Sequence, residues 1–309
     1  MASISLRPMN GTEWSAVADL IHSSTNGWYE SHGRDPVFTC GPEDVELYCR
    51  VYEALDPGCC ILAIDDSTQQ ILGSCFYHPR PTHVSLGIMN VHPDAFGHGV
   101  ARRLLKFITD FAAQENNPVR LVSSAMNLDS FSLYNRAGFT PFAIYQDMFL
   151  EVPKQGLGQR PEGHDRVRDA TPEDVGAMAL LESELVGIDR HRDFEYFMAN
   201  RDGIWHSSVI ESADGALSGF LVSVADPACN MLGPGVARSA SDALALLGRE
   251  LDHHRGRAPV FLLPADQPEL TAAVYTWGAR NCEMHLGQVL GTAPRPRGVV
   301  LPTFLPESG

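Results

Sequence analysis

The sequence predicts an α/β (α+β) protein built from two similar domains, on three observations. Short apolar, strand-like runs alternate with amphipathic helical segments along the 309 residues. A chain of this length with 44% hydrophobic residues can form two cores of about 150 residues each. A stretch rich in proline, glycine and charge separates two halves with a similar order of segments. We therefore expect one domain at 1–152, a linker at 153–165 and a second domain at 166–309.

The first half alternates between the two kinds of segment in a definite order. Its strand-like runs are short and apolar, whereas the segment 101–113 places Leu104, Leu105 and Ile108 at helical spacing on one apolar face. Clusters of glycine, proline and polar residues separate the segments. The expected elements are strand 3–8, helix 13–23, loop 24–41, helix 42–55, strands 59–65, 71–78 and 84–91, helix 101–113, strand 119–125, helix 130–137 and strand 142–152.

The second half repeats this pattern. Arg7, which precedes a helix, corresponds to Arg168 at an offset of 161 residues. Tyr134 corresponds to Tyr275 at an offset of 141 residues. A repeat of this length indicates two copies of one folding unit.

Composition excludes several classes of function. The net charge of −15 divides into −7 before residue 155 and −8 after it, so neither half has the basic face that nucleic acid or anionic lipid requires. A cationic partner, such as an amine, is favoured instead. No apolar run reaches the roughly 18–20 residues of a membrane span, and the N-terminus lacks the apolar core of a signal peptide. These features predict a cytoplasmic protein.

Cysteine and histidine patterns point to neither disulfides nor metal. The seven cysteines include no C-x-x-C pair, and adjacent Cys59 and Cys60 lie in an apolar run, which predicts reduced core residues. The twelve histidines show no ligand spacing, and His253 and His254 lie near the end of an expected helix, where surface positions are usual. The sequence therefore predicts no metal site.

A glycine turn joins the strand at 84–91 to the helix at 101–113. Gly97 and Gly99 let the backbone approach a ligand, and the first helical N–H groups attract an anion. A P-loop would need Gly-Lys-Ser/Thr, which does not occur here. A dinucleotide fingerprint would need a third glycine where Arg102 stands. The remaining interpretation is an acyl-CoA pyrophosphate loop.

The first half resembles the GNAT superfamily of acyl-CoA-dependent N-acetyltransferases. The family motif, Gln/Arg-x-x-Gly-x-Gly/Ala, corresponds to the run from Phe96 through Ala101, with Phe96 standing where the family has a polar residue. An Asn follows at Asn127, and the family's Tyr-x-x-x-Gly-Phe is the run from Tyr134 to Phe139. The resemblance implies two tandem GNAT-fold domains, each a mixed, mostly antiparallel sheet flanked by helices, with acetyl-CoA as co-substrate.

The resemblance also implies site residues. Tyr134 would protonate the departing CoA thiolate, since a phenol with a pKa of about 10 is protonated at neutral pH. The backbone N–H of Val91 would stabilise the oxyanion, and Arg102 and Arg103 could add charge-assisted contacts. The implied cofactor-binding residues are Asn90, Val91, Phe96, Gly97, His98, Gly99, Val100, Ala101, Arg102, Asn127 and Tyr134.

The acceptor side is less defined. The strand at 84–91 contains no carboxylate, so the general base stays open among Glu30, His32, His78, His83, Asn90 and His92. The long aromatic loop at 24–41 predicts a substrate wall, and its candidate residues are Trp28, Tyr29, Glu30 and His32.

The second copy contains a stretch that resembles the glycine loop but does not correspond to it. Residues 233–238 resemble 97–102 but lie out of register with the following helix, and the aligned positions are 238–242. There we expect Ser241 to cap the helix and Asp242 to place a negative charge where pyrophosphate would bind. We therefore expect a degenerate second domain without cofactor binding.

The sequence thus predicts an acetyl-CoA-dependent N-acetyltransferase that acts by direct transfer on a primary amine, a small molecule rather than a protein. The alternatives are a non-enzymatic acyl-CoA sensor, suggested by Phe96, and an interaction protein. The identity of the acceptor and a homodimer are left open.

Overall fold

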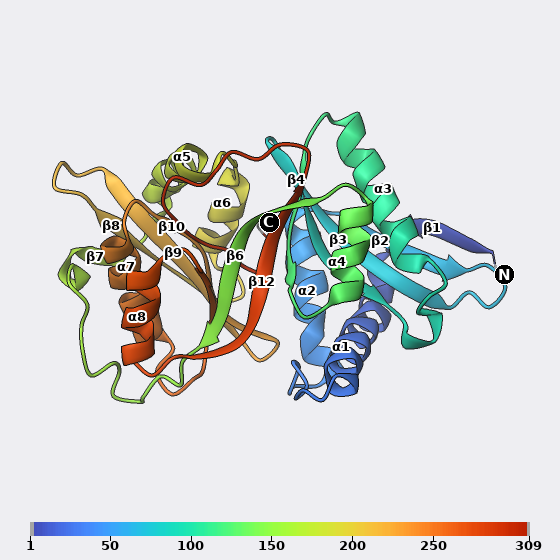
Figure 1. Ribbon diagram of the computed structural model, residues 1–309, viewed down its shortest axis with the longest axis horizontal. Coiled ribbons are helices and arrows are strands. Elements are labelled where there is room, and N and C mark those ends of the chain that lie inside the picture. Colours follow the sequence, from blue (N-terminus) through green and yellow to red (C-terminus); the bar gives the residue numbers. More distant parts are fainter. Residues whose placement is uncertain (1–2, 308–309) are drawn as a thin grey trace. The chain divides into compact units, whose positions relative to one another are not determined.

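The computed structural model describes residues 3–307, and contacts divide the chain into two compact units (Figure 1). Unit 1 contains the residues up to 79, residues 83–119 and the segment Phe304–Glu307. Unit 2 contains Arg80–Thr82 and Arg120–Thr303. Within residues 3–307, no helix is both long and apolar enough to cross a membrane.

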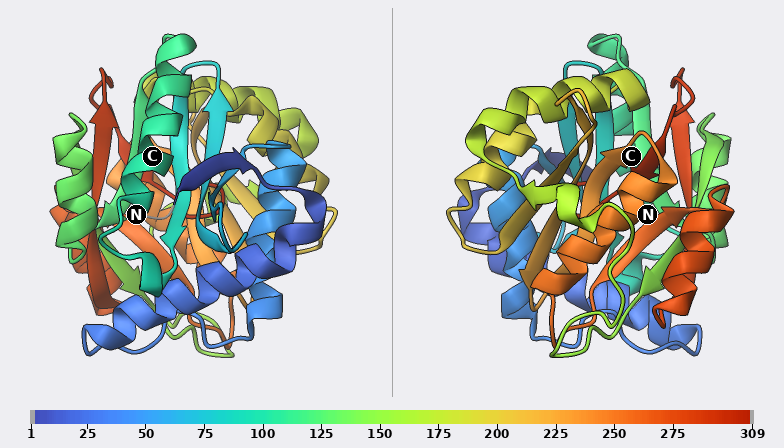
Figure 2. Two further views of the ribbon diagram at one scale, coloured as in Figure 1. Left: turned by 90° about the vertical axis from the view of Figure 1, so that its right-hand side faces the viewer. Right: turned by 90° about the vertical axis from the view of Figure 1, so that its left-hand side faces the viewer.

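Unit 1 is a sheet with helices on both faces. Its strands follow the order β1-β2-β3-β4, and β2 pairs antiparallel with both β1 and β3. Figure 2 (left) shows these strands between α3 on one side and α1 and α2 on the other. The elements are β1 (Ile4–Pro8), the 3-10 turn η1 (Gly11–Glu13), α1 (Trp14–Ser31), α2 (Pro42–Leu55), β2 (Cys60–Asp65), β3 (Ile71–Arg80), β4 (His83–Val91), the turn η2 (Pro93–Ala95) and α3 (Val100–Gln114).

The apolar stripe predicted for the helix at 101–113 faces the core of unit 1. Leu104, Leu105 and Ile108 are each at most 2% exposed, so α3 covers its face of the sheet with the side chains that the helical spacing selected. The cysteines of β2 and β3 belong to this core, and burial raises the pKa of the Cys60 and Cys75 thiols well above the usual range. This fits inert core thiols rather than nucleophiles.

The prediction of a loop at 24–41 is wrong for residues 24–31, because α1 continues to Ser31. Two polar residues that suggested a loop are satisfied inside the helix. The Ser24 hydroxyl donates to the Leu20 carbonyl at 2.6 Å, and the Asn26 amide both donates to and accepts from the backbone of Phe38. Asn26 thus ties the returning chain to the helix, and the irregular segment begins only at residue 32.

Unit 2 is a mixed, mostly antiparallel sheet with the strand order β5-β12-β6-β11-β10-β9-β8-β7, while β13 pairs with β10. Only the β10–β11 pair is parallel among the pairings described within it. Figure 2 (right) shows α5 and α6 on one face and α7 and α8 on the other. The elements are β5 (Val119–Ser124), α4 (Leu128–Arg136), β6 (Thr140–Phe149), η3 (His164–Arg166), β7 (Val167–Asp169), η4 (Pro172–Asp174), α5 (Val175–Val186), α6 (His191–Ala199), β8 (Trp205–Glu211), β9 (Leu217–Asp226), β10 (Cys229–Ala237), α7 (Ala240–His253), β11 (Val260–Pro264), α8 (Pro268–Thr276), β12 (Arg280–Leu290) and β13 (Val299–Leu301).

The two halves of the sequence exchange their last strands. β6, from the first half, lies between β11 and β12 of the second half and pairs antiparallel with both. β12 in turn lies between β5 and β6. Because of this exchange, the compact units follow different boundaries from the sequence halves. The division at 1–152 and 166–309 stays a prediction about the duplication.

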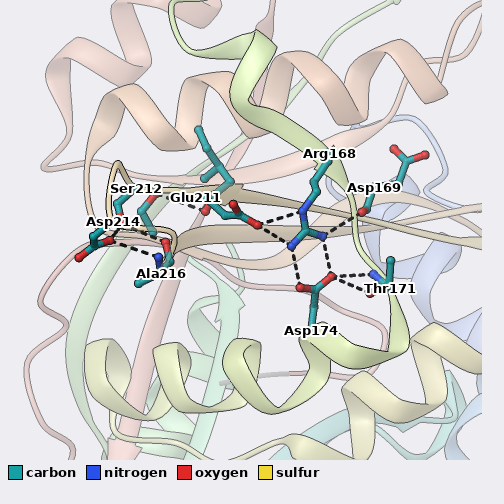
Figure 3. Close-up of polar contacts among 10 residues, drawn as sticks. Arg168, Asp169, Thr171, Asp174, Glu211, Ser212, Asp214 and Ala216 are labelled. Carbon is teal, nitrogen blue, oxygen red and sulfur yellow. Dashed lines mark hydrogen bonds and ion pairs between the residues drawn. The ribbon is translucent and has the colours of Figure 1, made fainter.

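The beginnings of the two halves share one local structure at the predicted offset of 161 residues. Arg7 forms a two-bonded ion pair with Glu13 at 2.8 and 2.5 Å, and Arg168 forms the same pair with Asp174 at 2.7 and 2.8 Å (Figure 3). Each carboxylate also closes a capping box at the start of the next helix, with Asn10 in the first copy and Thr171 in the second. The same side-chain contacts thus recur in both halves, which supports a duplication.

Candidate functional site

The connection between β4 and α3, residues 92–99, leaves its backbone open to a ligand. Gly97 and Gly99 have φ angles of +77° and +78°, in the left-handed region that favours glycine. A Cβ added to either residue would meet nothing within 4 Å. These glycines therefore serve the backbone conformation and the open space above it, since neither is needed to avoid a clash with the fold.

Five consecutive or nearly consecutive N–H groups point to an anion site here. Among the hydrogen bonds within residues 3–307, none uses the N–H group of Gly97, Gly99, Val100, Ala101 or Arg102. The first paired N–H of α3 is that of Arg103, which donates to the Gly99 carbonyl at 3.2 Å. Unpaired N–H groups at the start of a 15-residue helix bind phosphate oxygens well, because the helix dipole adds to the hydrogen bonds. The residues present fit a pyrophosphate group.

We call the backbone of residues 97–102, with these unpaired N–H groups, the cradle. The side chains around it are mostly exposed. The Phe96 ring is 51% exposed, so an apolar surface stands where the family motif has a polar side chain. The Arg103 guanidinium donates to the Ile4 carbonyl at 3.1 Å, which leaves Arg102 as the better candidate for a contact with phosphate. His98 is exposed on the loop and its N–H is paired with the Ala95 carbonyl.

The end of β4 is fixed to α1 through Asn90. Its side-chain NH₂ donates to the hydroxyl of Ser24 at 2.7 Å and lies 3.2 Å from that of Thr25. Its side-chain oxygen is buried and has no partner among the described residues, so an acceptor atom remains available beside Val91. Ser24 and Thr25 were not predicted as contacts of Asn90. The signal that could have found them is two hydroxyls in the helical register of buried Leu20 and Ile21.

The expected substrate wall lies on the last turns of α1. Trp28, Tyr29 and Glu30 are helical, and His32 is the residue that ends the helix. The His32 ring stacks on Trp28 with centroids 4.2 Å apart and its Nδ1 lies 2.8 Å from the Trp28 carbonyl. Glu30 and His32 are exposed. The four residues form a partly aromatic helix end instead of part of a loop.

Two of the open base candidates are committed to buried structural contacts. His78 lies between Asp56, at 2.8 Å from Nδ1, and Glu307, at 3.3 Å from Nε2, while Tyr52 donates to Glu307 at 2.7 Å. Burial acts to lower the pKa of His78, but the two carboxylates outweigh it and raise the pKa, so this histidine favours its charged form. His83 is buried and contacts the Ser85 hydroxyl at 3.1 Å. Neither ring suits a base that accepts a proton from substrate.

His92 also has a structural contact, because its Nδ1 accepts from the N–H of Asp94 at the start of η2. Of the six open candidates, Glu30 and His32 are exposed on unit 1 and Asn90 lies at the strand end. Among these candidates, the two that are exposed both lie at the end of α1.

Asn127 and Tyr134 belong to unit 2. The Asn127 side chain caps α4 by accepting from the N–H of Ser130 at 2.9 Å. Tyr134 is 6% exposed, and its ring contacts that of Phe139 at a centroid distance of 5.7 Å. The predicted site residues thus fall into two ordered sets, one in each unit.

The corresponding helix start in the second half lacks a cradle. β10 ends at Ala237 and α7 begins at Ala240, so only residues 238–239 join them. The capping residue is Ser239, which accepts from the N–H of Asp242 at 3.1 Å; the expectation of Ser241 was wrong by two positions, because the connection is that short. Asp242 forms an ion pair with Arg166 at 2.8 Å. The stretch at Gly233 and Pro234 that resembles the glycine loop lies inside β10.

The exchanged strands and the glycine turn at the start of α3 can be compared with known folds and family patterns. The family model described as "Acetyltransferase (GNAT) family" matches residues 25–139. No curated protein is a match. The family match lies in the first half of the chain, and the solved structures with the same fold include GNAT proteins.

Solved structures show the same fold along almost the whole chain. A Pyrococcus horikoshii protein provisionally described as an acetyltransferase has a TM-score of 0.75 at 15% identity and covers 96% of this chain and 94% of its own. A GCN5-related N-acetyltransferase from Sphaerobacter thermophilus has a TM-score of 0.64 at 18% identity, with coverages of 95% and 96%. A tandem GNAT protein from the clavulanic acid biosynthesis pathway has a TM-score of 0.60 at 14% identity, with coverages of 94% and 100%. At these identities the likeness establishes the fold alone.

Proposed function

We propose that this protein is an acetyl-CoA-dependent N-acetyltransferase that transfers an acetyl group directly to a primary amine. The observation that carries the proposal is the set of unpaired N–H groups at the start of α3, behind two open left-handed glycines. A helix start with this many available donors can hold an anion through several hydrogen bonds at once. The GNAT family generally uses acyl-CoA, whose pyrophosphate has the required charge.

Each step of the transfer has a candidate group in this chain. The N–H groups of residues 97 and 99–102 hold the pyrophosphate and thereby fix the acyl arm. The Val91 N–H, at the end of β4, stabilises the oxyanion that forms when the amine nitrogen attacks the thioester carbonyl. The carbon–sulfur bond then breaks, and the Tyr134 phenol gives its proton to the sulfur. Before the attack, the ammonium form of the amine gives one proton to a base, for which Glu30 and His32 at the end of α1 are the exposed candidates. After the attack, the nitrogen gives up a second proton, which restores the Tyr134 phenol.

The acceptor is proposed to be a small cationic amine. The net charge of −15 attracts cations at long range, and the aromatic end of α1, with Trp28 and Tyr29, suits the apolar part of such a molecule. The second half, whose helix start is closed by Ser239 and Asp242, takes no acyl-CoA in this proposal.

Isothermal titration with acetyl-CoA, followed by a thiol-release assay over a panel of primary amines, tests the proposal. We expect one acetyl-CoA bound per chain and thiol release with at least one amine. Binding without turnover on any of the alkylamines, amino sugars and amino acids tested would instead favour a sensor, for which the exposed Phe96 in the motif is the supporting observation. Absence of binding would overturn both readings.

A further inference from the structure

Three side chains that can bind metal meet on one face of the exchanged strands in unit 2. Asp147 of β6 lies directly opposite Glu283 of β12 in the antiparallel register, and His285 follows two positions along β12, on the same face. Asp147, Glu283 and His285 are 6%, 9% and 7% exposed, respectively. One ligand atom from each lies within 4.8 Å of the others. The acyl-transfer chemistry uses none of these residues.

Two carboxylates lie close together in this buried group. Two carboxylates that face each other across a strand pair repel, and burial increases the cost because water cannot screen them. The Ser124 hydroxyl donates to Glu283, and the Asp147 Oδ2 atom lies 3.4 Å from Nδ1 of His285. The second oxygen of Asp147, Oδ1, is buried with no hydrogen-bond partner among the described residues. A cation, a proton or an ordered water molecule can satisfy a buried carboxylate oxygen at this point, and of these the cation also offsets the repulsion between the two carboxylates.

We propose that Asp147, Glu283 and His285 bind one divalent metal ion of borderline hardness, with Zn²⁺ as the first candidate. Two carboxylates and one imidazole are ligands that zinc accepts, and the two negative charges cancel the charge of the ion. Mg²⁺ and Ca²⁺ fit less well, because they prefer oxygen ligands alone and larger numbers of them. The site is independent of the proposed acyl transfer.

The position of the ligands gives the ion a structural role. Asp147 comes from the last strand of the first half, whereas Glu283 and His285 come from the last strand of the second half. An ion held by all three would join the two exchanged strands within unit 2. Its binding free energy would therefore appear as stability of the folded chain.

The test uses the full chain after treatment with a chelator, titrated with ZnCl₂ by calorimetry and followed by thermal unfolding. We expect one Zn²⁺ bound at this site and a rise in Tm on its addition. Asp147→Asn and His285→Gln should each weaken this binding by more than the roughly 10- to 100-fold that the loss of a supporting hydrogen bond costs a metal site. Co²⁺ should give visible absorption bands in the wild type that are lost in Asp147→Asn.

A matched control comes from a second, more exposed group on unit 2. Asp169, His206 and His253 also place ligand atoms within 4.8 Å of one another, but Asp169 is exposed and paired with Arg249 at 2.7 Å. His253→Gln should leave the Zn²⁺ titration and the Tm rise of the buried site unchanged. If His253→Gln removes them and Asp147→Asn does not, the proposal is wrong.

The variant Asp147→Asn also separates a metal from a shared proton and from misfolding. Asparagine keeps the volume and removes one buried charge, so the metal-free variant should unfold at a temperature equal to or above that of metal-free wild type. If the wild type binds no Zn²⁺ while the variant is more stable, the two carboxylates share a proton and the metal site does not exist.

Discussion

The starts of α3 and α7 occupy equivalent places in the two halves and have opposite chemistry. At α3, residues 92–99 include two left-handed glycines, and the N–H groups of Val100, Ala101 and Arg102 are unpaired within the described chain. At α7, residues 238–239 connect strand and helix directly, and the Ser239 cap and the Asp242 carboxylate fill the space. The length of one connection therefore decides whether a helix start can receive an anion.

The two helices also differ in what they bury. The buried residues of α3 are apolar, whereas those of α7 include Asp242 and Glu250. Glu250 is 0% exposed and accepts from the hydroxyls of Ser208 and Ser223 and from His206. The start of α7 thus makes polar contacts within the protein, whereas the first N–H groups of α3 have no partner among the described residues.

The largest expected effect comes from closing the open helix start. Gly99→Asp places a carboxylate where the pyrophosphate would lie and should abolish measurable acetyl-CoA binding, because like charges repel at the site that the helix dipole otherwise favours. Isothermal titration measures this loss.

Gly58→Asp is the matched control for backbone strain. Gly58 also has a φ angle of +77° with nothing within 4 Å of an added Cβ, but it lies in the turn before β2. We expect it to bind acetyl-CoA like the wild type. Wild-type affinity in Gly99→Asp would remove the cradle from the site.

The next effect separates the two equivalent tyrosines. Tyr134→Phe should leave acetyl-CoA binding intact and slow turnover by about 10- to 1000-fold, because the acid for the leaving thiolate is lost. Tyr275 is 47% exposed and hydrogen-bonded to Asn281 and Gln146, so Tyr275→Phe should change turnover by less than about twofold. Steady-state rates of both variants with the best amine decide the matter. Equal turnover in the two variants would exclude Tyr134 as the acid.

Local patterns in the sequence predicted the cradle well, because it depends on neighbouring residues. Gly97 and Gly99 follow a strand and precede an amphipathic helix, and the structure has each of these in place. The recurrence of the Arg7 contact at Arg168 likewise required only short-range partners, Glu13 and Asp174.

The features that were missed depend on partners far away in the sequence. Nothing local to Thr140–Phe149 shows that this strand pairs with β11 and β12 instead of completing its own half. For the same reason the facing of Asp147 and Glu283 could not be foreseen. Propensity alone ended the first helix near Ser23, because the contact of Asn26 with Phe38, which carries the chain past that point, is a tertiary one.

A smaller effect, on stability, tests the polar interior of α7. Burial acts to raise the pKa of Glu250, but His206 and the serine hydroxyls outweigh it, so the pKa lies below its ordinary value of 4.5. Burial acts to lower the pKa of His206, but Glu250 outweighs it, so the pKa lies above its ordinary value of 6.5. Glu250→Gln should therefore reduce the free energy of unfolding by about 1.5–3 kcal/mol, the contribution of hydrogen bonds to a charged group.

The pH dependence of that difference has a defined sign. The lowered pKa of Glu250 adds stability that is complete above pH 4.5 and lost as the pH falls further, and the raised pKa of His206 adds stability that is complete below pH 6.5 and lost as the pH rises further. The free energy of unfolding of the wild type should therefore exceed that of the variant most between pH 4.5 and pH 6.5. The charged or titratable groups Asp169, Arg249 and His253 also lie near this pair. Urea unfolding at several pH values measures this difference in the free energy of unfolding.

Lys106→Ala, at the exposed Lys106–Asp110 pair of α3, is the control, with an expected change in the free energy of unfolding below about 0.5 kcal/mol at every pH. A pH-independent difference for Glu250→Gln would contradict the assigned charges.

The smallest expected effect comes from removing the carboxylate at the start of α7. The change tests whether this removal alone makes that helix start a binding site. Asp242→Ala removes the carboxylate that accepts from Ser239 and pairs with Arg166, and it should lower the free energy of unfolding by about 1 kcal/mol, as for the loss of a capping contact. Acetyl-CoA stoichiometry should stay at one per chain, because residues 238–239 still leave no glycine loop in front of α7. Calorimetry on Asp242→Ala and on the double variant with Gly99→Asp measures both points. A second acetyl-CoA bound by Asp242→Ala, or binding restored in the double variant, would show that the charge and not the length of the connection keeps the second half closed.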